Sequence, residues 1–259
     1  MTYDHPSTLG QLLNLIKTKS KHSDYQLLYP TLSNLLSEAD YRPSGKYERE
    51  RQSYMIKNCP LEGLRILDIG ANTGYFSLAA LDSGALHVTS QEGNAEHAEF
   101  IALSASCLAI TEKILVCPSY FDFSESSTQT SRYDLILCLN VLHHLGDDFG
   151  DGGISLDAAK SEMINSLNRL SKSTKRCWMQ LGFNWKGDRY RPLFKNGTKQ
   201  ELIEFVKKGI KDYWAVEKVA VFNPISKAYE DVNTTNLARF DQLGEFLNRP
   251  LFLLKSQAV

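Results

Sequence analysis

Continuous runs of apolar residues alternate along the chain with segments in which apolar residues recur every three or four positions. This is the pattern of strands that alternate with helices. The run at 64–69 does not switch between apolar and polar residues, which is typical of a parallel strand covered on both faces, whereas the run at 214–222 alternates. The pattern therefore predicts a doubly wound α/β sheet. The expected strands cover residues 64–69, 86–91, 114–117, 133–138, 176–181, 214–222 and 249–255.

The first 60 residues show helical spacing without a strand-like run. Apolar residues recur at helical intervals over 9–16, and further helices are expected over 32–38 and 46–57. We therefore expect residues 1–60 to form a helical extension and residues 61–259 to form the main α/β domain.

The stretch 64–80 joins an apolar strand to a small-residue helix through a turn with two glycines. A dinucleotide-binding loop has its second glycine where this chain has Asn72 and its third where it has Tyr75. A P-loop needs a Lys and a Ser or Thr after its last glycine, and this chain has Tyr75 and Phe76. A carboxylate just before the turn, Asp68, disfavours phosphates and favours a cationic amine. The residues expected to shape this pocket are Asp68, Gly70, Asn72 and Gly74.

A second acidic residue, Glu92, follows the strand expected over 86–91, one strand–helix–strand step after Asp68. In nucleoside-binding doubly wound folds, a carboxylate at this place receives the two ribose hydroxyls, because it offers two acceptor oxygens to a vicinal diol. The turn and the two carboxylates together predict a site for a nucleoside that carries a positive charge and no phosphate.

The stretch 132–145, R-Y-D-L-I-L-C-L-N-V-L-H-H-L, is the second informative pattern. Together with 64–80, it resembles motifs I and IV of class I S-adenosylmethionine (SAM) methyltransferases, and the resemblance extends over about residues 64–255. It implies that SAM is the cofactor and that the chain is an enzyme. It also implies a seven-stranded, mostly parallel sheet whose last strand is antiparallel. Beside the turn and Glu92, the implied SAM contacts are Asn140 and either Ser119 or Tyr120.

Two histidines, His143 and His144, come just after the expected fourth strand, close to the methyl group in the arrangement that the resemblance implies. A neutral imidazole there could take the proton from a hydroxyl acceptor. Alternatively, one histidine caps the following loop and the other packs in the core. The acids of loop 146–153 lack the spacing of an EF-hand, so we expect a lid there and no metal site.

The segment 182–197 interleaves basic and aromatic residues and follows the fifth strand, at the sheet edge where open α/β folds bind ligands. Basic side chains suit phosphate or carboxylate, and aromatic rings suit the face of a sugar or a base. An ordinary surface loop is the other interpretation. The expected substrate-binding residues are Lys186, Arg189, Tyr190, Arg191 and Lys195.

A weaker resemblance concerns the acceptor. The segments N-V-L-H-H-L (140–145) and G-E-F-L-N-R-P-L-F-L-L (244–254) are similar to the methyltransferase part of O-antigen chain-terminating enzymes. That similarity implies O-methylation of a sugar or a sugar phosphate of a surface glycan. A tRNA-modifying methyltransferase, a small-molecule natural-product methyltransferase and a non-enzymatic SAM-binding protein are the alternatives.

Composition limits these alternatives only in part. The net charge of −1 provides no overall field for nucleic acid or for an anionic membrane, although a local basic patch leaves nucleic acid open. The five cysteines form no C-x-x-C pair, which favours free thiols in a reducing compartment. The first residues do not resemble a signal peptide, and no apolar run is long enough to cross a bilayer. We therefore expect a cytoplasmic protein of undetermined oligomeric state.

Overall fold

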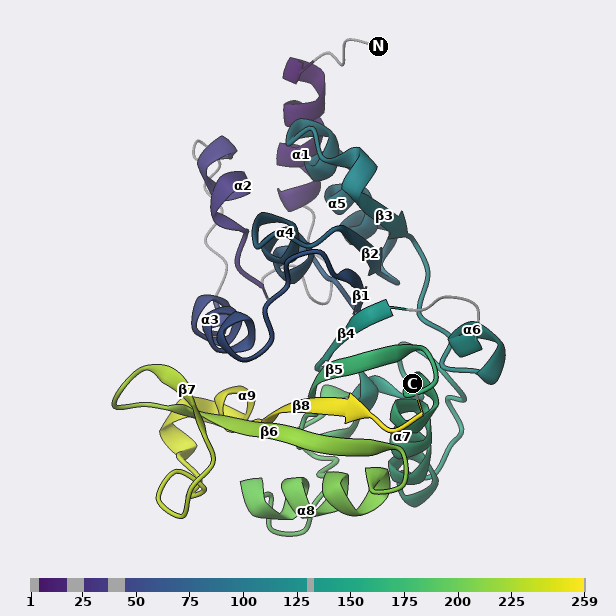
Figure 1. Cartoon of the computed structure of the whole chain (residues 1–259), viewed down its shortest axis with the longest axis vertical. Helices are drawn as coiled ribbons and strands as arrows, with labels where there is room; N and C mark the ends of the chain where they lie inside the picture. The colour runs from purple at the N-terminus through teal and green to yellow at the C-terminus, as the bar shows by residue number, and fades with distance from the viewer. Residues whose placement is uncertain (1–4, 18–25, 37–44, 130–132, 259) are drawn as a thin grey trace. The chain divides into compact units, whose positions relative to one another are not determined.

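A computed structural model describes residues 5–17, 26–36, 45–129 and 133–258 of the chain. It forms two compact units, Met1–Tyr120 and Phe121–Val259 (Figure 1). Each unit contributes parallel strands with helices between them. The expected boundary at residue 60 stays a prediction.

Three parallel strands in the order β3-β2-β1 form the sheet of the first unit. The chain enters them through three helices, and the outer helix α1 packs beside α5 (Figure 1). The elements are α1 (His5–Lys17), α2 (Pro30–Leu35), α3 (Glu48–Asn58), β1 (Arg65–Ile69), α4 (Tyr75–Asp82), β2 (His87–Gln91), α5 (Ala95–Cys107), η1 (Thr111–Lys113) and β3 (Ile114–Cys117).

Local sequence signals fix the helices that follow β1 and β2. Helix α4 begins directly after Gly74, whose φ of 82° lies in the left-handed region that glycine adopts without strain. The Asn94 side chain accepts a hydrogen bond from the amide of His97 and thereby caps α5. Both helices consequently start at the ends of their strands, which places the connecting turns at one edge of the unit's sheet.

The second unit is a mixed sheet in the order β4-β5-β8-β6-β7. Strands β4 and β5 are parallel, β8 runs antiparallel to both β5 and β6, and β7 pairs antiparallel with β6. The elements are α6 (Glu125–Gln129), β4 (Tyr133–Leu139), η2 (Leu142–His144), α7 (Leu156–Leu170), β5 (Thr174–Gln180), η3 (Trp185–Gly187), α8 (Lys199–Ile210), β6 (Trp214–Asn223), β7 (Ala228–Asp231), η4 (Asp241–Leu243), α9 (Gly244–Leu247) and β8 (Leu251–Ser256).

Helix α8 shows why the apolar spacing of the sequence produces this packing. Leu202, Val206 and Ile210 recur every four positions and are fully buried, so they form one apolar face on the helix. The indole of the buried Trp214, at the start of β6, donates a hydrogen bond to the carbonyl of Leu167 on α7 at 3.1 Å. The helices and strands of the unit are thereby joined in one core.

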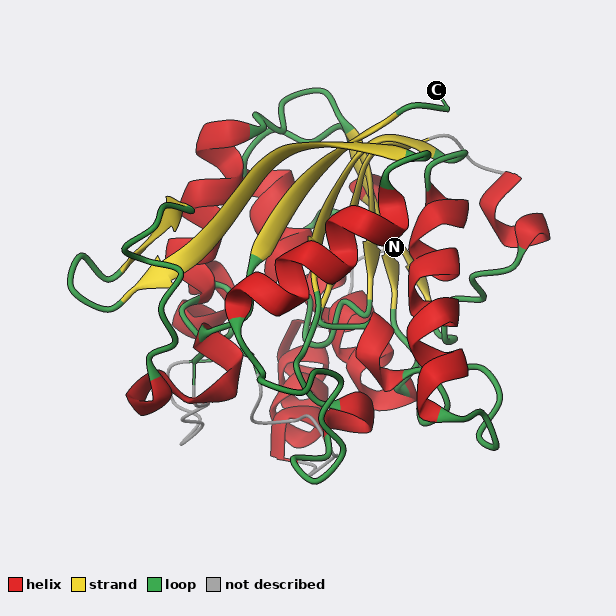
Figure 2. Ribbon diagram, turned by 90° about the horizontal axis from the view of Figure 1, so that it is seen from below, coloured by secondary structure: helices red, strands yellow, loops and turns green. Residues whose placement is uncertain are grey.

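The doubly wound, mostly parallel sheet with an antiparallel last strand is confirmed, with one short strand more than the seven expected. The addition is β7, which forms a hairpin with β6 inside the segment expected to be a long loop (left of Figure 2). The helix expected over 32–38 is α2, Pro30–Leu35, and positions 37 and 38 lie outside the described residues. Across the described ranges, no helix combines the length and the apolar character needed to span a bilayer.

Candidate functional site

The turn after β1 has an unusual backbone because three of its residues are left-handed: Gly70, Asn72 and Gly74, with φ of 71°, 54° and 82°. Its amides nevertheless all donate to acceptors within the protein. Gly70 and Ala71 donate to the carbonyl of Gln91 at 2.8 and 3.2 Å, Asn72 to Glu92 Oε2 at 2.7 Å, Thr73 to Asn72 Oδ1 at 2.8 Å and Gly74 to the carbonyl of Ala71 at 2.9 Å. A phosphate-binding loop aims such amides at its ligand, so this turn is unsuited to a phosphate.

The carboxylate of Glu92 connects the turn to the start of α5. Its Oε2 accepts from the amide of Asn72 at 2.7 Å, and its Oε1 accepts from the amide of Asn94 at 2.8 Å. The side chain is largely buried, and His97 Nδ1 lies 4.0 Å from Oε1. These two hydrogen bonds hold the carboxylate of Glu92 in a fixed orientation beside the turn.

Asp68 lies inside the unit and not at an open surface. Ser77 Oγ of α4 donates to its Oδ2 at 2.7 Å, and Ser77 Oγ lies 2.7 Å from Ser90 Oγ on β2. Burial raises the pKa of the carboxyl group to about 6, and the hydrogen bond from Ser77 opposes that rise. Asp68 therefore links β1, β2 and α4 beneath the turn, and its predicted contact with a cationic amine stays a prediction.

The loop after β3 places Ser119 and Tyr120 beside the end of β2. Gln91 Nε2 donates to both the carbonyl oxygen and the hydroxyl of Ser119, at 2.6 and 2.8 Å. The half-exposed ring of Tyr120 lies directly over Gly93, because a Cβ built on Gly93 would be 2.2 Å from the ring. An aromatic face thus lies next to Glu92, where an adenine base could stack.

Replacing Gly93 with alanine should displace the Tyr120 ring and weaken nucleoside binding about tenfold, because the new methyl group cannot share the space of the ring. Calorimetric titration with SAM measures the loss. Gly10→Ala is the matched control, since nothing lies within 4 Å of a Cβ at Gly10. Equal affinities of the two variants would rule out a contribution from the Tyr120 ring.

In the second unit, Asn140 follows β4 with a left-handed φ of 64°. Its Nδ2 donates to Gln180 Oε1 at 3.0 Å, and its Oδ1 accepts from Arg249 Nη1 at 2.8 Å. Arg249 also pairs with Glu245, and Glu245 Oε1 accepts from the amide of Phe183 at 2.7 Å. A buried polar network therefore fixes the Asn140 amide, and Gln180, Glu245 and Arg249 are members that the sequence reasoning missed.

The two histidines differ in their surroundings. His143 is 1% exposed, and its Nδ1 lies 3.3 Å from the amide of Gly182, which donates to it. The half-buried His144 stacks obliquely on His143, with ring centroids 4.4 Å apart, and turns its Nδ1 toward Asp147 and Asp148. Solvent and ligands can therefore reach His144 more easily than His143.

The basic segment after β5 is organised around one buried indole. Trp185 donates through Nε1 to the carbonyl of Leu145 at 2.7 Å, and the cations of Lys186 and Arg191 lie 4.7 and 5.6 Å from its ring centroids. Asn184 pairs with Pro192 across the segment. We call residues 184–192 the basic hairpin.

The remaining residues predicted to bind substrate lie further out along the segment. Arg189 lies over the ring of Tyr190, which is 84% exposed. Lys195 is exposed beyond the hairpin, and its backbone amide donates to Glu201 on α8. The structure thus gathers Lys186 and Arg191 on one indole and leaves Arg189, Tyr190 and Lys195 at the surface.

The basic hairpin and the histidines form one local surface of the second unit. Segments η2 and η3 pack together, and a Cβ built on Gly187 would lie 3.4 Å from His144 Cε1. A Cβ built on Gly146, just after the histidines, would lie 3.2 Å from Lys186 Cε. Cationic side chains, an indole and an imidazole therefore meet here, a combination that suits an anionic, partly apolar ligand.

Comparison with known proteins identifies the fold. No protein-family model matches the sequence, and no curated protein sequence is significantly similar to it. The solved structure of WbdD, a bifunctional kinase-methyltransferase, matches with a TM-score of 0.58 and 16% identity over 94% of this chain and 46% of WbdD. PH1948 from Pyrococcus horikoshii, proposed to be an RNA methyltransferase, matches with a TM-score of 0.50 and 13% identity over 97% and 98% of the two chains. The expected class I methyltransferase fold is thereby confirmed.

Proposed function

We propose that the chain is a SAM-dependent methyltransferase whose acceptor is a phosphorylated sugar of a surface glycan. The single observation that carries the proposal is the pairing of an internally hydrogen-bonded turn with the fixed carboxylate of Glu92. The class I methyltransferase fold and the basic hairpin support it further.

The first unit offers the chemistry that the nucleoside part of SAM requires. The turn uses its amides within the protein, which suits a ligand without phosphates. A carboxylate at the position of Glu92 suits the two ribose hydroxyls, because it offers two acceptor oxygens to a vicinal diol, and the Tyr120 ring suits the flat face of adenine. The backbone carbonyl and the hydroxyl of Ser119 both accept hydrogen bonds from Gln91. Ser119 would accept a hydrogen bond from the adenine amine.

The acceptor side is proposed from the basic hairpin and its neighbour His144. Lys186 and Arg191 would bind the phosphate group, and the rim of the Trp185 indole would pack against the sugar. Arg191 also lies 3.4 Å from Asp188, so Lys186 would supply more of the charge that is available to a ligand.

The reaction needs little from the protein beyond positioning. SAM supplies a methyl group on a sulfonium whose departure leaves a neutral thioether. A phosphate oxygen carries its own negative charge, so no proton has to be removed before it is methylated. A sugar hydroxyl would instead need a base, for which His144 and His143 stay the predicted candidates.

The experiment that tests the function is transfer of radiolabelled methyl from SAM to a lysate separated into lipid-linked glycans, RNA and small metabolites. We expect label in the glycan fraction, and we expect phosphatase treatment of that fraction beforehand to abolish it. Label confined to RNA or to small metabolites would contradict the proposed acceptor. Failure to bind either SAM or its demethylated product in a calorimeter would overturn the proposal altogether.

Charge removal in the basic hairpin tests the acceptor site separately. The double variant Lys186→Met/Arg191→Met should raise KM for the glycan about tenfold or more and leave SAM affinity unchanged, because both cations belong to the proposed phosphate site. Lys207→Met/Lys208→Met, on the exposed face of α8, is the matched control. An equal KM for the glycan in the two double variants would show that the basic hairpin does not bind the acceptor.

A further inference from the structure

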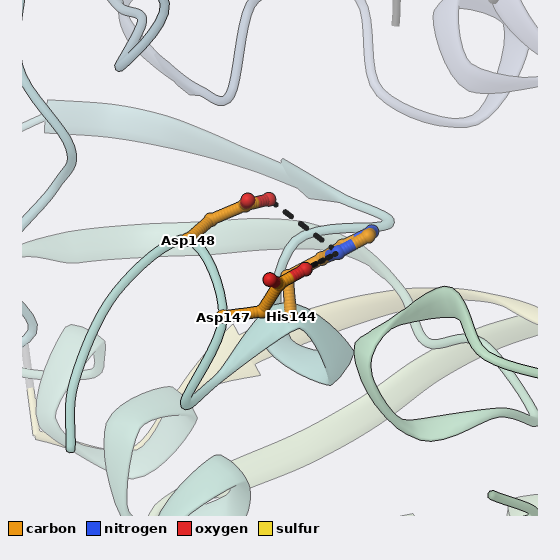
Figure 3. Close-up of side chains that lie close together, drawn as sticks. All are labelled: His144, Asp147 and Asp148. Atoms are coloured by element: carbon orange, nitrogen blue, oxygen red, sulfur yellow. Dashed lines mark ion pairs between the residues drawn. The ribbon is translucent and has the colours of Figure 1, made fainter. Parts of the chain in front are cut away.

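A His–Asp–Asp cluster lies in the connection that follows β4 in the second unit: His144 is the last residue of η2, and Asp147 and Asp148 come shortly after it. His144 Nδ1 lies 3.4 Å from Asp148 Oδ2 and 3.9 Å from Asp147 Oδ2. One potential ligand atom from each residue lies within 4.8 Å of the other two. Figure 3 shows both carboxylates turned toward the same edge of the imidazole ring.

A tight backbone turn brings these side chains together. The amides of Asp147 and Asp148 both donate to the carbonyl of His144, at 2.9 and 3.1 Å. Gly146, which lies between His144 and the two aspartates, has a φ of 82° and allows the chain to reverse without strain. Its amide donates a hydrogen bond to the carbonyl of Phe149. The three side chains therefore leave the turn on one side.

The distances do not fit an ordinary hydrogen bond between the imidazole and a carboxylate. A charge-assisted hydrogen bond from an imidazolium to a carboxylate spans about 2.7–2.9 Å, and both separations here are longer. Two carboxylates that converge on a single nitrogen also repel each other. Donors bound to one ion at about 2.0–2.2 Å lie roughly 3–3.5 Å apart. The separation of His144 Nδ1 from Asp148 Oδ2 falls in this range, whereas Asp147 Oδ2, at 3.9 Å, would have to move closer to share the ion.

We propose that His144, Asp147 and Asp148 bind one divalent transition-metal ion of the Mn²⁺ or Zn²⁺ class. One imidazole and two carboxylates match the ligand preferences of these ions, and an ion neutralises the repulsion between the acids. The side chains are 15%, 34% and 22% exposed, so an ion can enter and keep coordination positions open to solvent or substrate.

The position of the cluster suggests what the open coordination positions would hold. Gly187 and Lys186 of the basic hairpin lie against His144 and Gly146, so the ion would adjoin the proposed phosphate site. A phosphate oxygen could then bind the ion while Lys186 and Arg191 bind the others. This part of the inference rests on the proposed function, whereas ion binding itself does not.

Metal binding is tested with Mn²⁺ and the purified full chain, by the loss of the free-ion signal in electron paramagnetic resonance and by competition with Zn²⁺. We expect one Mn²⁺ per chain, displaced by Zn²⁺. Affinity should fall at least tenfold in Asp148→Asn and in His144→Ala, because each variant removes one of three protein ligands. Asp212→Asn, an exposed acid on the same unit, controls for the change in net charge.

Thermal melts without metal show whether the variants fold, and the Asp148→Asn variant retains the shape of the side chain. Absence of Mn²⁺ and Zn²⁺ binding by the native chain would overturn the inference, as would equal affinities in the Asp148→Asn and Asp212→Asn variants. Absence of metal binding would mean that the cluster is only an ion pair between His144 and the two aspartates. Calorimetry with SAM reports on the proposed methyltransferase independently, so either conclusion can fail without the other.

Discussion

Replacing Glu92 with glutamine should weaken SAM binding about 100-fold, or by roughly 3 kcal/mol. The carboxylate accepts from the amides of Asn72 and Asn94 through its two oxygens. A glutamine side chain has one acceptor oxygen, so its NH₂ group would face one of these amide donors and displace the turn. The same NH₂ group would no longer accept from a ribose hydroxyl. Calorimetric titration with SAM and with its demethylated product measures the effect.

Glu96→Gln provides the matched control for this experiment. Glu96 lies on the exposed side of α5, four residues after Glu92, and its replacement changes the net charge by the same amount. We expect that variant to bind SAM like the native chain. Affinities within twofold of each other for the Glu92→Gln and Glu96→Gln variants would mean that Glu92 only fastens the turn, and the ribose contact would have to be sought elsewhere.

The sequence predicted the ends of the strands in the first unit well. The reason is clearest for β1, which is buried from Ile66 to Ile69 and therefore has a nearly continuous apolar run. It also predicted which polar residues follow those ends, such as Glu92 and Tyr120. It did not predict the direction of Asp68. That carboxylate lies under the turn because Ser77 and Ser90 supply hydroxyl groups there, and this pairing depends on how α4 packs on β1 and β2.

Polar contacts between distant segments were the hardest features to anticipate. The sequence predicts only that Arg249 begins an apolar strand. Glu245, four positions earlier, lies in the segment 244–254 that resembles glycan-modifying enzymes. The structure joins Arg249 to Asn140, 109 positions away in the sequence. No local periodicity encodes such a pairing. The signal in the sequence is a charged residue next to a buried strand, which indicates that a polar partner lies nearby.

The His–Asp–Asp cluster illustrates a different limit. In the sequence, the acids of 146–153 lack the spacing of a calcium loop, and His144 is indicated only as a candidate base. The two groups meet because Gly146 adopts a left-handed conformation, which folds Asp147 and Asp148 back toward the imidazole. Ligand sets that depend on a reversal of the backbone require the turn geometry, which sequence spacing does not specify.

Replacing Arg249 with methionine should lower the free energy of unfolding by about 3 kcal/mol. Methionine fills the space of the aliphatic stem, but Glu245 loses its buried cation and Asn140 Oδ1 loses a donor. Urea unfolding measures the change, with Arg176→Met as the control.

Arg176 also pairs with a glutamate, Glu217, at 2.9 Å, but its side chain is 45% exposed against 8% for Arg249. Water replaces the partner of an exposed ion pair, so the control should cost less than about 1 kcal/mol. Equal losses in the two variants would show that the network around Asn140 adds nothing beyond an ordinary surface pair, and Asn140 would then lack the rigid support that its left-handed position implies.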